Sequence, residues 1–122
     1  GTINIMISLN ISLPSAIMTR AIITITEGKT AALQDLGIAD VNNGLPATGT
    51  GTDGITLITD PDASRYTDAG TFSVLGSLLA SAAYETVREC LELYDKPWNR
   101  DDSLATPPAV DLSRLRNKEC GH

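Results

Sequence analysis

Between residues 47 and 54 the chain alternates threonine with glycine and then places one carboxylate, in the run ATGTGTDG (Ala47–Gly54). A turn needs one or two glycines, so three within six residues exceed what a connection requires. Glycine lets the backbone approach a ligand closely, and unpaired N–H groups in such a loop can face an anion or a developing oxyanion. This run is therefore the first place where we expect chemistry.

The residues before this loop predict a strand followed by a long helix. Residues 2–10 alternate loosely and are rich in isoleucine, as in a β-strand. The helix is expected from about residue 13 to residue 36, with Ser12 as its N-cap, Pro14 in its first turn and Gly37 as its C-terminal stop. At 100° per residue, one arc of this helix is apolar and contains Ile17, Met18, Ala21, Ile22, Ile25, Ala32, Leu33 and Leu36.

The residues after the loop repeat the same order. An apolar strand is expected at about 54–59, and a second long helix over 72–94 follows the segment 67–71. The apolar positions of this helix recur every three or four residues at Phe72, Leu75, Leu79, Ala83, Val87, Cys90 and Tyr94. On its wet face, Arg88 and Glu92 are spaced for an i,i+4 ion pair.

The order strand, helix, strand, helix predicts a layered α/β or α+β domain over residues 1–96. The first helix could be the crossover of a right-handed βαβ unit, and an antiparallel pair of strands is the alternative. Because the first strand begins with almost no loose residues before it, we expect that an N-terminal portion of the sheet is missing. Prolines and polar residues predict a separate C-terminal tail over residues 97–122.

The composition excludes several classes of function. The 122 residues carry a net charge of −6 and no basic patch, which argues against binding to nucleic acid or to an anionic membrane. The longest apolar runs fall far short of the roughly 20 residues of a membrane span. Two cysteines, Cys90 and Cys120, and no charged-then-apolar signal peptide indicate a reduced, cytoplasmic protein. The single histidine, His122, is the last residue, so histidine-based metal or triad chemistry is not expected.

Lys29 falls inside the apolar arc of the first helix, between Met18 and Ile22. One explanation is snorkelling, in which the stem is buried and the ammonium reaches water. The other is a functional ammonium at the floor of a site. Glu27 lies two positions earlier, where a neighbouring lysine would help to keep a glutamate ionised as a base. The alternative for Glu27 is a solvated helix face.

Three blocks of residues combine with the GTINI sequence at residues 1–5: EGKTAAL (Glu27–Leu33), ATGTGTD (Ala47–Asp53) and DAGT (Asp68–Thr71). In this order and at this spacing they resemble the adenosylcobinamide amidohydrolase (CbiZ) family of cobamide salvage. The resemblance covers about residues 1–94, and the first two blocks together are specific. It corresponds to the C-terminal part of such a protein.

This resemblance implies hydrolysis of the amide that joins the aminopropanol arm to adenosylcobinamide, which leaves adenosylcobyric acid for corrinoid (vitamin B12) synthesis. The corrinoid is then the substrate, and no cofactor is implied. The family usually carries a histidine two positions after the glycine of the Asp-Ala-Gly block and a lysine two further on. Here those positions hold Phe72 and Val74, so we expect impaired activity or altered specificity. Phe72 is expected to pack in the core, with stacking on a ligand as its alternative.

Amide hydrolysis needs a nucleophile or activated water, a base, an acid for the leaving amine and oxyanion donors. With the family block in view, we predict Glu27, Lys29 and Asp53 as catalytic residues. Asp53 could hold a water, orient a threonine or pair with Lys29, and its alternative is a turn carboxylate. The predicted substrate-binding residues are Asn4, Thr48, Gly49, Thr50, Gly51, Thr52 and Asp68, with loop N–H groups as oxyanion donors.

These substrate-binding residues also have structural alternatives. Threonines beside a strand match β-propensity, Asp68 is suited to cap the second helix, and Asn4 and Asn10 can serve in turns or at a sheet edge. No metal site is predicted. Asp53, Asp68 and Glu27 offer oxygen ligands to a hard cation, but their spacing does not demand one.

Two other functions remain open beside hydrolysis. The first is a binding domain that keeps a corrinoid pocket but lacks turnover. The second is a structural domain that acts as a homo-oligomer or in association with the missing N-terminal portion. The small residues of Gly76–Ala83, which allow close packing, support the second.

Overall fold

The structure is a computed structural model that describes residues 1–94. Its elements are β1 (Asn4–Ser8), α1 (Ser15–Asp35), β2 (Gly54–Ile58) and α2 (Val74–Tyr94). The predicted strand-helix-strand-helix order of a mixed α/β fold is confirmed, and each element is slightly shorter than its sequence pattern. The predicted tail at 97–122, with Cys120 and His122, lies outside the described residues.

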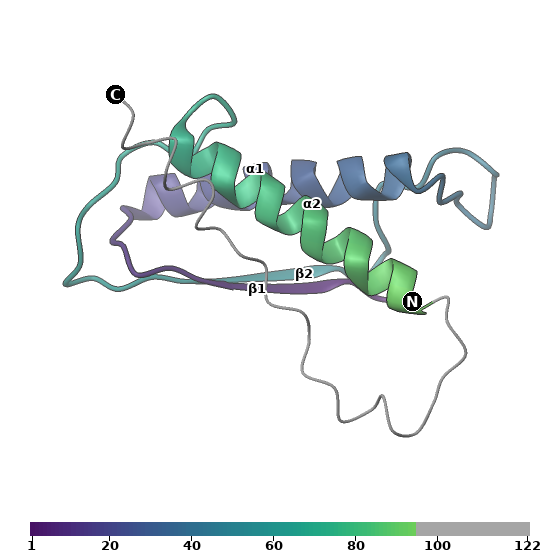
Figure 1. The fold of residues 1–122 in the computed structure, drawn as a ribbon, viewed down its shortest axis with the longest axis horizontal. Helices are drawn as coiled ribbons and strands as arrows, with labels where there is room; N and C mark the ends of the chain where they lie inside the picture. Colours follow the sequence, from purple (N-terminus) through teal and green to yellow (C-terminus); the bar gives the residue numbers. More distant parts are fainter. Residues whose placement is uncertain (95–122) are drawn as a thin grey trace, which may run out of the picture.

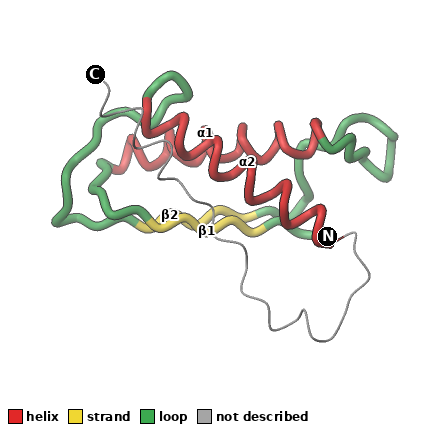
Figure 2. The backbone as a smooth tube through the Cα atoms, in the orientation of Figure 1, coloured by secondary structure: helices red, strands yellow, loops and turns green. Residues whose placement is uncertain are grey.

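The two strands form a parallel pair. Their register runs from Asn4 opposite Gly54 to Ser8 opposite Ile58, so the antiparallel alternative is wrong and α1 is the crossover between them. Both helices lie on the same side of the strands (Figures 1 and 2). The loop before β2 therefore returns from the end of α1 to the amino ends of both strands, which is where the glycine-rich run is placed.

Residues of β1 alternate between a covered and an open face. Ile5 and Ile7 are half-buried against the core, whereas Asn4, Met6 and Ser8 are exposed. Met6 is 74% exposed, because the helices cover only one face of the sheet. Period-two alternation of this kind is normal for a strand with one covered face.

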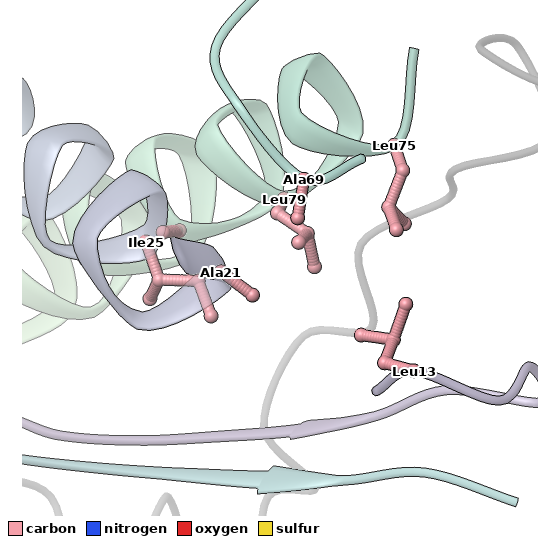
Figure 3. Packing of buried hydrophobic residues seen from close by; sticks show 7 residues of the cluster. Leu13, Ala21, Ile25, Ala69, Leu75 and Leu79 are labelled. Atoms are coloured by element: carbon pink, nitrogen blue, oxygen red, sulfur yellow. The ribbon is translucent and has the colours of Figure 1, made fainter. Parts of the chain in front are cut away.

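The core lies where the two helices meet above the strands. Its buried side chains, drawn in Figure 3, are Leu13, Ala21, Ile25, Ala69, Leu75, Leu79 and Ala83. Gly28 lies at the contact between α1 and α2. A Cβ atom on Gly28 would overlap the carbonyl oxygen of Ala80, so the absence of a side chain at this position allows the helix backbones to touch.

The ends of the helices correct two predictions. Ser12 does not cap α1, because α1 begins after Pro14 without any side-chain cap. Instead the backbone of Ser12 continues the pairing with the second strand's chain, donating from its N–H to Ser64. The predicted stop at Gly37 is confirmed by a φ of 66°, a left-handed conformation that glycine adopts without strain.

At the start of α2 the cap is Ser73 and not Asp68. The Ser73 hydroxyl oxygen accepts the N–H of Gly76 at 3.0 Å, as an N-cap does three residues into a helix. Asp68 stabilises the preceding turn, where its carboxylate accepts the N–H of Gly70 at 2.9 Å. Capping by Asp68 is therefore wrong, since the helix begins at Val74 and not at residue 72.

Of the apolar positions predicted for α2, only those in the middle of the series are buried. Phe72 is fully exposed, so core packing of this side chain is wrong. It lies in the turn before the helix, where the helical period does not apply. Cys90 and Tyr94 are also exposed. The expected ion pair between Arg88 and Glu92 is confirmed at 3.2 Å.

No helix within residues 1–94 combines the length and the apolar character needed to cross a membrane.

Candidate functional site

A buried ion pair joins the first helix to the glycine-rich loop. The Lys29 ammonium lies 2.6 Å from an oxygen of Asp53, and the two side chains are only 9% and 12% exposed. The Lys29 side chain enters the core because its position is in the apolar arc of α1. Asp53 is the residue directly before β2, and its side chain contacts the Lys29 ammonium. Snorkelling of Lys29 is therefore wrong, and the pairing with Asp53 that the sequence offered as one possibility is confirmed.

Asp53 accepts further hydrogen bonds that tie three segments together. Its oxygens accept the N–H of Ile3 at 2.9 Å, the N–H of Thr50 at 2.9 Å and the hydroxyl of Thr50. With Lys29, this carboxylate thus has four donors, from α1, from the start of β1 and from its own loop. These hydrogen bonds tie the loop to α1 and to the residue before β1.

Gly49 is the glycine that the ion pair requires. A Cβ atom at this position would lie 2.5 Å from the Asp53 carboxylate and 2.6 Å from the Lys29 ammonium. Any side chain here would displace one of the charged groups. The close passage of backbone over the ion pair explains this glycine, whereas Gly51 has no atom within 4 Å of such a Cβ and meets no such limit.

Hydrogen bonding controls the charge of Asp53. Burial by itself raises the pKa of this carboxyl, but the donors from Lys29, Thr50 and Ile3 outweigh it and hold the pKa well below its usual range. A carboxylate that binds protons so weakly is a poor general base near neutral pH. Its geometry suits it instead to fix Lys29 and the loop.

This shift has a consequence for the pH dependence of stability. Because the pKa of Asp53 is lower in the folded chain, its contribution is present above its unfolded pKa and is lost as the pH falls below about 4. We expect the urea midpoint to fall steeply between about pH 4 and about pH 2. The double variant Lys29→Met/Asp53→Asn should show a shallower fall. Equal slopes for the two proteins would contradict the assignment.

The other loop threonines make separate contacts. The backbone oxygen of Thr48 accepts the hydroxyl of Thr30 at 3.0 Å, and the hydroxyl of Thr52 is hydrogen-bonded to that of Thr2. The N–H groups of Gly49 and Gly51 have no hydrogen-bond acceptor within residues 1–94. Donation from these two amides to a ligand, which the loop composition predicted, stays a prediction.

A cavity opens beside the loop. Its volume is about 300 Å³, and Gly49 and Thr50 contribute to its wall together with Ile3, Leu33, Leu91 and Tyr94. Asn4 lies at the same end of the sheet, where its side-chain oxygen would be 2.8 Å from a Cβ on Gly54. The structure thus gathers Asn4, Lys29, Asp53 and the loop residues 48–52 at the amino ends of the strands. Asn10 lies beyond the other end of β1.

Glu27 and Asp68 are not part of this cluster at the amino ends of the strands. The Glu27 carboxylate accepts the hydroxyl of Thr71 at 2.8 Å and faces a different cavity of about 370 Å³, shared with Tyr84 and Glu85. Residues two apart on a helix point to different sides, so the ammonium of Lys29 pairs with Asp53 and not with Glu27. The sequence placed these residues in one site, whereas the structure forms two clusters.

The second cluster contains residues that the sequence analysis missed. Thr71 directly contacts Glu27 and precedes the exposed Phe72. In the sequence, Thr71 could have been found by its place in the Asp-Ala-Gly-Thr block. Within residues 1–94, no three histidine, cysteine, aspartate or glutamate side chains gather as a metal site would require, so Asp53, Asp68 and Glu27 do not form a shared cation site.

The fold and these clusters define a small α/β domain with a clamped glycine-rich loop. Residues 1–98 match the family model of adenosylcobinamide amidohydrolase. The chain belongs to this family. It is 41% identical over 97 residues to "Uncharacterized protein MJ1613" of Methanocaldococcus jannaschii, a match that covers 79% of this chain and 38% of that protein. No solved structure matches.

Proposed function

We propose that the chain takes part in hydrolysis of the aminopropanol amide of adenosylcobinamide, which yields adenosylcobyric acid and aminopropanol in corrinoid salvage. The observation that carries the proposal is the clamped loop within a chain of this family. Two of its glycine N–H groups are unpaired within residues 1–94, and one of these glycines, Gly49, lines a cavity, as a donor to a developing oxyanion would. The corrinoid is the substrate in this reaction.

The residues divide into distinct roles under this proposal. Gly49 and Gly51 donate N–H groups to the carbonyl oxygen of the amide as it gains negative charge. Lys29 and Asp53 position the loop. Glu27, exposed and held by Thr71, faces the other cavity, so it is the candidate base only for an amide bound on that side. There it takes a proton from the attacking water and returns one to the leaving amine. The C–N bond of the amide breaks as the C–O bond of the acid forms.

The direct test is incubation of the purified chain, and of the complete product of its gene, with adenosylcobinamide. Products are read by chromatography and mass. Adenosylcobyric acid and aminopropanol from the chain would establish hydrolysis by residues 1–122 themselves. Product from the longer protein alone would make the chain one part of the enzyme. If neither protein binds or cleaves the substrate, the proposal fails.

A second candidate is a corrinoid-binding domain without turnover. The exposed Phe72, where the family usually carries a histidine, favours it, because an aromatic ring in water is free to stack on a planar ligand. The two candidates differ in one readout. Tight binding of adenosylcobinamide without release of aminopropanol would support this second function and overturn the first.

Phe72→His tests the importance of this position. The side chain is fully exposed, so we expect the free energy of unfolding to change by no more than about 0.5 kcal/mol. Restoring a histidine beside the Glu27 cluster should raise kcat for adenosylcobinamide by at least about tenfold, as a gained acid–base group would. Phe72→Gln is the control that adds polarity without a titrating ring. An equal effect of both variants would contradict the acid–base explanation.

A further inference from the structure

The outer edge of the first strand has unused backbone groups. Gly54 donates its N–H to Ile3 at 3.1 Å and Leu9 donates to Ile58 at 2.8 Å, so the odd-numbered residues of β1 bond to β2. In a parallel ladder the intervening residues point the other way. The N–H and C=O groups of Asn4, Met6 and Ser8 therefore face outward, and within residues 1–94 they have no partner. We call these groups the β1 edge.

An apolar groove lies beside this edge. Ile7, Leu9 and Ile11 form one wall, and Leu75, Leu78 and Ala82 of α2 form the other, around about 260 Å³. Both helices lie on the same side of the sheet (Figure 2). The helix α2 packs mainly on α1 and makes few contacts with the strands. We call this space the β1–α2 groove, and it is where a neighbouring strand would place its inward side chains.

A sheet of two parallel strands is unusually small. Parallel sheets normally have several strands with both faces covered, and a third strand or a helix is usually needed for stability. Here one face is open and includes Met6 and Ile58, which are 74% and 46% exposed. The M. jannaschii relative is much longer, since the match covers only 38% of it. A family protein thus has additional chain that could complete this sheet.

We propose that a strand from the part of the family protein that this chain does not span pairs with the β1 edge. Its backbone hydrogen-bonds to the outward groups of Asn4, Met6 and Ser8. Alternate apolar side chains of that strand enter the β1–α2 groove, as in other cases of strand addition. The β1 edge is favoured over the outer edge of β2 because the groove opens beside it. The inference concerns assembly of the sheet and does not depend on hydrolysis.

Amide hydrogen exchange, read residue by residue by NMR, tests this pairing in two intact proteins. In the present chain the amides of Met6 and Ser8 should exchange rapidly, while those of Ile5 and Ile7 are protected by β2. In the full-length M. jannaschii relative, the amides aligned with Met6 and Ser8 should exchange at least about a hundredfold more slowly than in the present chain. No corrinoid is added, so failure here is distinct from failure of the proposed hydrolysis.

A proline at the edge provides the matched variant. Met6→Pro removes an outward N–H only, so the Tm of the present chain should change little. Proline at the aligned position of the relative should lower its Tm by at least about 5 °C, whereas threonine, which keeps the N–H, should not. Rapid exchange at these positions in the relative would overturn the proposal. Protection of the Met6 and Ser8 amides in the present chain would also overturn the proposal. This holds for protection that depends on concentration, as pairing with a second copy would, and for protection that does not.

Discussion

Asp53→Asn is expected to lower the free energy of unfolding by about 3–5 kcal/mol at neutral pH, because it leaves the Lys29 ammonium buried without its counter-charge. The ammonium cannot reach water easily, since the Lys29 side chain is only 9% exposed. The asparagine side chain keeps the size of the original group, so the loss reports the charge of Asp53 and the hydrogen bonds that it accepts, and not packing. Urea unfolding followed by circular dichroism at pH 7 measures it.

The control variant is Asp62→Asn, which removes the same charge from an exposed turn and should change stability by no more than about 0.5 kcal/mol. The double variant Lys29→Met/Asp53→Asn should be more stable than Asp53→Asn alone, because removing both charges leaves no unpaired ion in the core. Additive losses from the two substitutions, or a loss below about 1 kcal/mol for Asp53→Asn, would show that the pair is not energetically coupled.

Gly28→Ala is expected to lower the free energy of unfolding by about 1–3 kcal/mol, although alanine favours helices by about 1 kcal/mol over glycine. The added methyl group would overlap the backbone of Ala80, so α1 and α2 would have to separate. Separation would also stretch the hydrogen bond from Tyr84 to Asp35, which joins the same helices. Thermal and urea unfolding of the variant measure the loss.

Gly51→Ala is the matched control for this substitution. No atom lies within 4 Å of a Cβ at Gly51, and its φ is not positive, so alanine there should be neutral or slightly stabilising. A neutral or stabilising effect of Gly28→Ala would mean that the helices are not in backbone contact. The prediction would then fail whatever the effect at Gly51.

Lys29, Asp53 and Glu27 show how much of the candidate site could be predicted from the sequence. Lys29 was recognisable because a charged side chain occupied an apolar arc, and Asp53 because a lone carboxylate closed a glycine-rich run. Their pairing was only one possibility until the loop was placed against α1. Glu27 shares the same sequence block as Lys29, yet it faces Thr71 in another cluster, because two residues of helix rotation turn the side chains apart.

Local patterns determined the four elements, their order and the end of α1 at Gly37, since period and turn chemistry act over a few neighbouring residues. Only the tertiary structure decided what depends on distant segments. It set the parallel pairing of β1 with β2, the four donors around Asp53 and the backbone contact at Gly28. It also left Phe72 in water, because the helix begins two residues later than the apolar pattern suggests. Long-range packing is the physical reason, since burial and charge pairing depend on chain segments far apart in the sequence.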